Sequence, residues 1–89
     1  MADVTLEIVN EKGLHARASA KLVEVVEAFD ATAEVSKDGN CASGDSIMGL
    51  LMLAASKGTT IEVQTAGPDA EALMKALAEL VANRFGEEQ

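Results

Sequence analysis

The spacing of apolar residues changes repeatedly along this chain, and the changes limit the folds that it can form. Val4, Leu6 and Ile8 alternate with polar residues, which predicts a first strand with one buried face. From residue 16 onward the apolar side chains recur at helical spacing, at Ala18, Leu22, Val25, Val26 and Phe29. We therefore expect a helix that begins directly after His15, separated from the strand by a short loop.

A hairpin and a short apolar helix are predicted next. Residues 32–37 alternate as a strand, Lys37-Asp38-Gly39-Asn40 tolerates positive φ, and residues 41–43 can return as the paired strand. Asp45-Ser46 then offers an N-cap to a very apolar helix, which we expect to end at Lys57-Gly58.

A fourth strand and a third helix complete the predicted order. Ile61 and Val63 alternate with polar residues, and the turn Gly67-Pro68-Asp69 precedes an apolar stripe that ends near Phe85. The members of this stripe are Leu73, Met74, Leu77, Leu80 and Val81. We expect the last residues, Glu87-Glu88-Gln89, to be a frayed tail.

The predicted order is thus β-α-β-β-α-β-α, with no internal repeat and no linker. Most strands are too polar on one face for helices to cover both faces of the sheet. We therefore expect one sheet with all helices on a single side. Eighty-nine residues can form one core without disulfides. The sequence therefore predicts an α+β open-faced sandwich that spans residues 1–89 as a single domain.

Charge and composition exclude several classes of partner. The chain carries 7 Lys and Arg against 15 Asp and Glu, and this net charge of -8 would repel nucleic acid and anionic lipid. Phe29 and Phe85 are the only aromatic residues, so no platform for base stacking exists. The start lacks a basic region followed by an apolar run, and the longest apolar stretch, 47–55, is shorter than the ~18 residues of a membrane span. We expect a cytoplasmic protein that binds neither nucleic acid nor membrane.

The single cysteine, Cys41, can form no internal disulfide and has no second Cys or His at metal-ligand spacing. We expect it to be a small, half-buried strand residue. The sequence predicts no metal site and no cofactor.

The start of the first helix departs from the usual capping rules. A first helical turn leaves four backbone N–H groups unpaired and carries partial positive charge, so it normally recruits Ser, Thr, Asp or Asn. Here it has His15, Ala16 and Arg17, and no acidic residue lies between Glu11 and Glu24. An anion such as phosphate would satisfy both the bare amides of Ala16 and Arg17 and the guanidinium. The basic residues Lys12, Arg17 and Lys21 make this region a positive island in an acidic chain.

This environment favours a nucleophilic imidazole at His15. A positive helix end disfavours the protonated ring, and the neutral ring can attack a phosphoryl group. The product phosphate would lie beside the first-turn amides and Arg17. The absence of an acid–base pair near His15 favours transfer over hydrolysis. Three alternatives stay open at this point: a histidine without function at the helix start, a small acylphosphatase-like hydrolase, and an adaptor that reads a phosphate on a partner.

Two segments of the sequence resemble a known family. They are Gly13-Leu14-His15-Ala16-Arg17-Ala18 and the stretch 46–53 with Lys57-Gly58, and they resemble the histidine-containing phosphocarrier protein (HPr) of the bacterial phosphoenolpyruvate-dependent phosphotransferase system. The similarity runs from Thr5 to Phe85. The resemblance implies a four-stranded antiparallel sheet in an open-faced sandwich.

The resemblance also implies roles for individual residues. His15 would accept a phosphoryl group on Nδ1 from enzyme I and pass it to an enzyme IIA-type protein, with Arg17 bracing the phosphate. Ser46 falls on the family's regulatory site, which HPr kinase/phosphorylase modifies in many members. The protein would then be a carrier rather than an enzyme, and we expect a monomer.

The sequence departs from the family pattern at two positions. Ala18 stands where most relatives have proline after the arginine, and Lys12 stands where a small polar residue is common. Neither change removes a reactive group. Residues 50–53, 61–63 and 66–68 look more like the nitrogen-related branch of the family (NPr) than the sugar-transport branch, which stays as the alternative.

The second helix offers a docking surface. A helix so rich in Met and Leu cannot bury every side chain against one sheet, so part of it should stay exposed beside His15. We expect Leu50 and Leu53 in the core. The predicted docking residues are Lys12, Lys21, Ile47, Met48, Leu51 and Met52.

Overall fold

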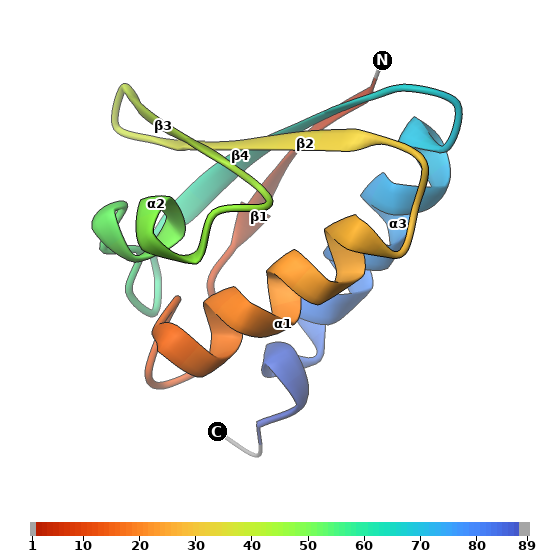
Figure 1. The fold of residues 1–89 in the computed structure, drawn as a ribbon. Helices are drawn as coiled ribbons and strands as arrows, with labels where there is room; N and C mark the ends of the chain where they lie inside the picture. The colour runs from red at the N-terminus through yellow and green to blue at the C-terminus, as the bar shows by residue number, and fades with distance from the viewer. Residues whose placement is uncertain (1, 88–89) are drawn as a thin grey trace.

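The computed structural model describes residues 2–87, and its element order is the predicted one (Figure 1). In chain order the elements are β1 (Ala2–Glu7), α1 (Ala16–Glu27), β2 (Thr32–Lys37), β3 (Asn40–Ser43), α2 (Ile47–Met52), β4 (Thr60–Ala66), α3 (Ala70–Ala82) and the 3-10 helix η1 (Arg84–Gly86). The helix predicted to begin directly after His15 is confirmed.

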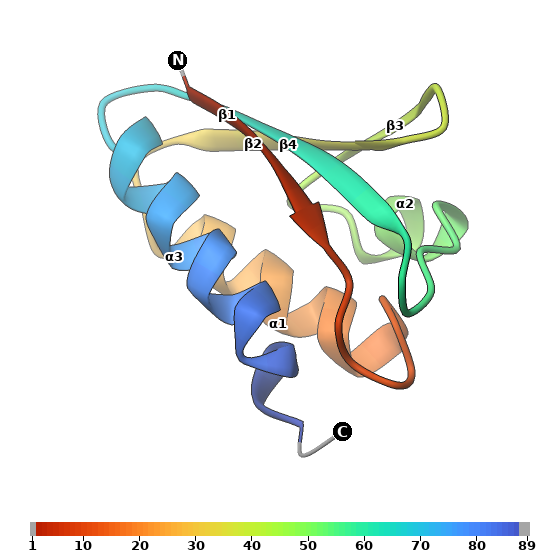
Figure 2. The same ribbon diagram turned by 180° about the vertical axis from the view of Figure 1, so that it is seen from behind.

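The four strands form one antiparallel sheet in the order β1-β4-β2-β3. Val63 of β4 pairs with Val4 on one side and Val35 on the other, so the apolar faces of three strands are in register. Figures 1 and 2 show α1, α2 and α3 together on one side of this sheet. The predicted α+β open-faced sandwich is confirmed.

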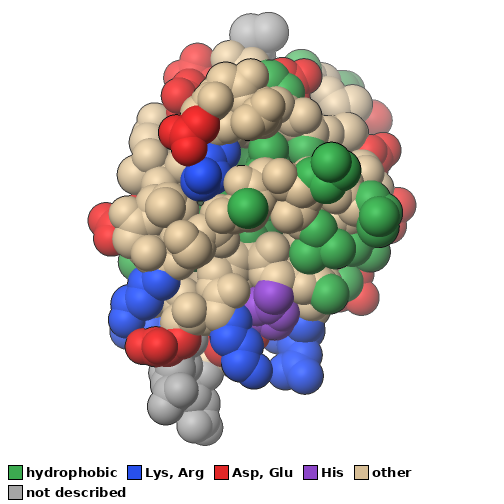
Figure 3. Space-filling model, turned by 90° about the vertical axis from the view of Figure 1, so that its left-hand side faces the viewer, with side chains coloured by type: hydrophobic (Ala, Val, Ile, Leu, Met, Phe, Trp, Pro, Cys, Tyr) green, Lys and Arg blue, Asp and Glu red, His purple; other side chains and the backbone are tan. Residues whose placement is uncertain are grey.

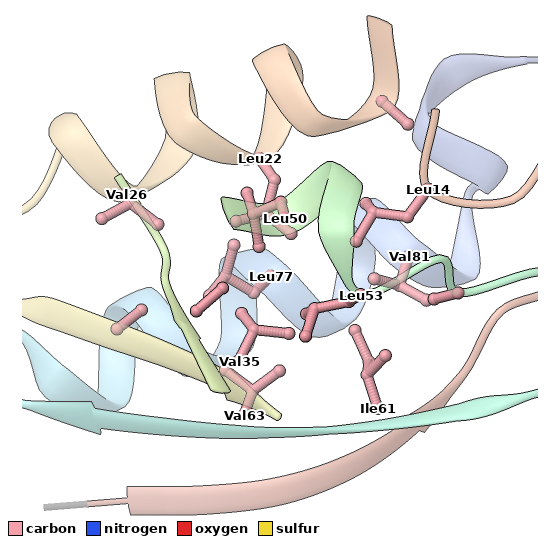
Figure 4. Packing of buried hydrophobic residues seen from close by; sticks show 14 of the residues in the cluster. Leu14, Leu22, Val26, Val35, Leu50, Leu53, Ile61, Val63, Leu77 and Val81 are labelled. Carbon is pink, nitrogen blue, oxygen red and sulfur yellow. The ribbon is translucent and has the colours of Figure 1, made fainter. Parts of the chain in front are cut away.

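The core lies between the sheet and the helices (Figure 4). Val35, Val63 and Ile61 point from the sheet toward Leu22 and Val26 of α1 and toward α2 and α3. Leu50 and Leu53 of α2 are buried, as expected. The largest fully buried side chains are Phe85, which lies in η1 and is 1% exposed, and a set of aliphatic residues, and the polar residues Asn10, Thr65 and Ser19 are buried with them.

The hairpin confirms the predicted turn but corrects the place of Cys41. Asp38 and Gly39 both have positive φ, 51° and 85°, as a two-residue turn between twisted strands requires. Ala42 pairs with Val35 and is buried, so the alternation of the strand directs Cys41 outward. Cys41 is therefore exposed rather than half-buried, and its Sγ lies 3.2 Å from Ser36 Oγ.

Two helices end earlier than predicted. The prediction that the second helix ends at Lys57-Gly58 is wrong: α2 ends at Met52, and Ala54 takes a left-handed φ of 53° just after it. Lys57 and Gly58 instead form a separate turn before β4. The third helix ends at Ala82, and a short reversal with positive φ at Arg84, Phe85 and Gly86 follows it.

Candidate functional site

His15 is the N-cap residue of α1. Its backbone is extended, with φ −83° and ψ −175°, and its Nδ1 accepts a hydrogen bond from the backbone N–H of Arg17 at 3.3 Å. The prediction that this helix lacks a side-chain cap is therefore wrong, because the imidazole takes the role that Ser or Asp usually has. The bond is longer than a typical N–H···O bond, and the His15 side chain is 26% exposed. The ring thus faces the helix end and remains open to solvent.

Other donors at this helix end remain free. The hydrogen bonds found within residues 2–87 include none from the amide of Ala16, which is an exposed residue. The first backbone bond of the helix runs from the Ser19 N–H to the His15 carbonyl at 2.8 Å. The side chain of Arg17 is exposed and forms no ion pair with the described part of the chain. The arrangement leaves an amide and a guanidinium available to an anion.

Gly13 fixes the loop that carries His15. Its φ is +66°, and a Cβ at this position would lie 2.4 Å from the Ala55 carbonyl oxygen. Next to it, the N–H of Leu14 donates to the same carbonyl at 2.8 Å. The loop before α1 is thereby joined to the segment that follows α2. This contact holds the start of α1 next to the second helix.

The predicted docking residues of α2 are mostly exposed. Met52 is 81% exposed, Met48 71% and Ile47 39%, whereas Leu51 is half-buried. Figure 3 shows apolar side chains gathered on the surface directly beside the histidine. Ser46 is the N-cap of α2, as predicted, and its Oγ accepts from the Gly49 N–H at 3.0 Å.

The basic residues do not all face solvent. Lys12 and Arg17 are exposed, and Figure 3 shows basic side chains around the histidine. Lys21, which was predicted to be part of the positive island and a docking residue, is half-buried, and its Nζ donates to the Phe85 carbonyl at 2.6 Å. Its position on α1 beside the reversal after α3 brings its long side chain to that carbonyl. Part of the predicted positive island therefore serves an internal contact.

The prediction of a frayed C-terminal tail is wrong for Glu87, while Glu88 and Gln89 lie outside the described residues. Glu87 Oε2 lies 2.5 Å from His15 Nε2, and Oε1 accepts from Asn10 Nδ2 at 2.8 Å. The hydrogen bond from Asn10 is the main cause that lowers the pKa of Glu87. Desolvation opposes it, and the contact with His15 and the charge of Lys12 add to the lowering. The Glu87 side chain is therefore an ionised carboxylate at neutral pH.

The His15 ring lies at the surface of the molecule (Figure 3). A hollow of about 380 Å³ lies elsewhere, along β2, β3 and β4, and no predicted site residue lines it. Within residues 2–87, no group of three or more His, Cys, Asp or Glu side chains could hold a metal ion. No helix of this part of the chain is both long enough and apolar enough to cross a bilayer.

Comparison with known proteins decides the family. The family model described as "PTS HPr component phosphorylation site" matches residues 2–83. The phosphocarrier protein HPr of Cupriavidus necator is 49% identical over 80 residues, which cover 90% of each chain. The chain belongs to the HPr family. Its general role is therefore that of a phosphocarrier of the phosphotransferase system.

Other HPr-family proteins agree in sequence and in fold. The phosphocarrier protein NPr of Escherichia coli K12 is 40% identical over 85 residues, 94% of each chain. The crystal structure of HPr-C-His from Thermoanaerobacter tengcongensis superposes with a TM-score of 0.94 at 39% identity, and the match covers 100% of both chains. The open-faced sandwich of this chain is the fold of HPr structures.

Sequence reasoning missed two residues near His15: Glu87, which contacts the ring, and Asn10, which bonds Glu87. Asn10 is fully buried in the loop after β1, where its Nδ2 also donates to the Gly13 carbonyl at 2.8 Å. A polar residue between a strand and a glycine gave no specific signal, since asparagine is common in loops. Glu87 is 72 residues away from His15 in sequence. Only the tertiary structure brings these side chains together.

Proposed function

We propose that this protein accepts a phosphoryl group on Nδ1 of His15 from phosphorylated enzyme I and passes it to an enzyme IIA-type protein. The observation that supports this most is the position of the ring: it caps α1 with Nδ1 toward the helix amides, and it is open to solvent. An acceptor nitrogen placed there meets an incoming phosphate at the positive end of the helix.

The first-turn donors stabilise the transferred group. When the Nδ1 electron pair attacks phosphorus, the Arg17 N–H loses its weak bond to Nδ1 and can donate to a phosphoryl oxygen instead. The amide of Ala16 and the guanidinium of Arg17 add a second donor and a positive charge. These groups favour transition state and product alike, and the open surface lets the next acceptor reach the phosphate. A carrier needs both properties.

The exposed face of α2 serves as the docking surface for both partners. Its apolar members are the exposed Ile47, Met48 and Met52 and the half-buried Leu51. We include exposed Lys12 and also Lys21, whose half-buried side chain bonds the Phe85 carbonyl. Apolar side chains exposed together on a small domain are typical of an interface. Transient association with several partners on this one face fits a protein that acts as a monomer.

Ser46 is the proposed site of regulatory phosphorylation. Its Oγ caps α2 and is half-buried beside the docking patch. A phosphate there would favour the helix dipole and add negative charge to the docking face. We expect altered partner binding with little change in fold, provided the cell contains HPr kinase/phosphorylase.

The proposed branch is the nitrogen-related one, in which the acceptor is a regulatory IIA protein. It rests on the likeness of residues 50–53, 61–63 and 66–68 to NPr and on the 40% identity with the Escherichia coli NPr. The sugar-transport branch is the alternative, favoured by the 49% identity with the HPr of Cupriavidus necator. Rates of transfer from the phosphorylated protein to a regulatory and to a sugar-specific IIA protein separate the two branches.

One incubation tests the carrier function. The protein is mixed with enzyme I and phosphoenolpyruvate, and its mass and the stability of the adduct are measured. A carrier gains one acid-labile, base-stable phosphoryl group, and His15→Ala abolishes it. A hydrolase would turn over a free acyl phosphate without retaining the group, and an adaptor would bind an anion without any covalent change. Either result would refute the proposal.

A further inference from the structure

A carboxylate lies on the side of the His15 ring opposite the proposed acceptor nitrogen. Glu87 Oε2 lies 2.5 Å from Nε2, and the Glu87 side chain is 13% exposed. The other carboxylate oxygen, Oε1, accepts a hydrogen bond from Asn10. The two ring nitrogens therefore have different partners, a backbone donor at Nδ1 and an acceptor at Nε2.

These partners determine where the imidazole proton lies. The Arg17 N–H can only donate, so Nδ1 must present its electron pair. The ionised Glu87 can only accept, so Nε2 must carry the hydrogen. Both contacts select the same tautomer of the neutral ring. The opposite tautomer would place two donors together at Nδ1 and two acceptors together at Nε2.

We propose that Glu87 is a positioning residue for phosphoryl transfer, which holds the proton of His15 on Nε2 and so keeps the electron pair of Nδ1 available. The proposal rests on the proposed function, because it assigns Nδ1 as the atom that accepts the phosphoryl group. Asn10 orients the carboxylate. A histidine whose second nitrogen bonds a carboxylate is a known means of fixing tautomer and ring orientation in protein sites.

The transfer step balances with the proton left in place. The Nδ1 electron pair forms the N–P bond while the bond between phosphorus and its atom on enzyme I breaks, and that electron pair returns to enzyme I. The proton stays on Nε2, so the ring becomes a phosphorylated imidazolium. The negative charge of Glu87 then lies next to the positive charge that the ring has gained. Transfer to the IIA-type protein reverses these changes.

Several contacts of the folded chain place Glu87 beside His15. After α3, Arg84 and Phe85 take a left-handed φ of 55°, which non-glycine residues rarely adopt, and Gly86 follows with 81°. Phe85 is buried and its carbonyl accepts from Lys21, which fastens the reversal to α1. This reversal turns the chain back toward the start of α1. Because the buried side chain of Phe85 and the bond from Lys21 hold this reversal in place, the position of Glu87 beside His15 is a property of the folded domain.

The test combines a measurement on the ring with one on transfer. Nitrogen-15 NMR of the unphosphorylated protein at a pH where the ring is neutral reports which nitrogen of His15 carries the hydrogen. We expect the Nε2–H tautomer to dominate in the wild type and to lose population in Glu87→Ala. We also expect phosphoryl transfer from enzyme I to slow by about tenfold, the lower end of the loss seen when the hydrogen-bond partner of a metal-ligating histidine is removed.

Glu79→Ala is the matched control. Glu79 is exposed on α3 and has no side-chain hydrogen bond within residues 2–87, so its removal changes net charge equally without touching His15. An unchanged tautomer in Glu87→Ala, an unchanged or faster transfer, or an equal effect of Glu79→Ala would overturn the proposal. If the wild type takes up no phosphoryl group from enzyme I, the proposed function fails, whereas the tautomer comparison still decides whether Glu87 positions the proton.

Discussion

Gly13→Ala should destabilise the domain strongly, because Gly13 joins the loop of His15 to the segment after α2. Its φ of +66° costs an alanine about 1 kcal/mol from backbone strain alone. The new Cβ would also lie 2.4 Å from the Ala55 carbonyl oxygen and 2.9 Å from Ser56 Cα. Both are backbone atoms, so the loop itself must move, at about 3 kcal/mol, the upper end of the cost of overpacking. The expected loss of about 4 kcal/mol is a large part of the stability of a small domain.

Gly39→Ala is the control for this prediction. Gly39 has a φ of +85°, and nothing lies within 4 Å of an added Cβ, so alanine there meets strain without a clash. We expect a loss of about 1 kcal/mol. Urea denaturation followed by circular dichroism measures the free energy of unfolding of both variants. If Gly13→Ala is no less stable than Gly39→Ala, the loop is not held as described and the reasoning fails.

Three further predictions follow from the site. Met48→Asp should weaken binding of enzyme I by about tenfold or more. Its Tm should stay nearly unchanged, because the Met48 side chain is 71% exposed. Calorimetry measures both quantities, and a large loss of stability with intact binding would contradict the prediction. Ser46→Ala should cost about 1 kcal/mol of unfolding free energy in urea, because the cap of α2 is lost, and a neutral result would count against that cap. The pKa of Glu87 is lowered in the folded state, so its ionised form stabilises the fold. At pH values above the ordinary pKa of glutamate, the wild type should therefore be more stable than Glu87→Gln. That advantage should disappear as the pH falls through the lowered pKa, and a difference that is independent of pH would refute it.

The order of elements could be predicted because it depends on local pattern. Alternation marked the strands, and the apolar stripe after His15 marked α1. The end of α2 could not be predicted in this way. Ala54 takes the left-handed conformation that usually requires glycine, and the apolar run around it shows no change in period.

Only part of the surroundings of His15 could be predicted from the sequence. The helix amides and Arg17 follow from the sequence next to the histidine, so the proposed anion site at this helix end could be predicted from the sequence. The carboxylate of Glu87 could not, because it reaches His15 through the reversal at Arg84, Phe85 and Gly86. Two of those three residues adopt positive φ without being glycine, and no local rule predicts that.

The most direct test of the central claim is to determine which nitrogen of His15 carries the phosphate. Phosphorus–nitrogen coupling in NMR of the nitrogen-15-labelled protein, after reaction with enzyme I and phosphoenolpyruvate, identifies the atom. We expect a single phosphoryl group on Nδ1, with the hydrogen retained on Nε2 next to Glu87. Phosphate on Nε2, on another residue, or on none would contradict it.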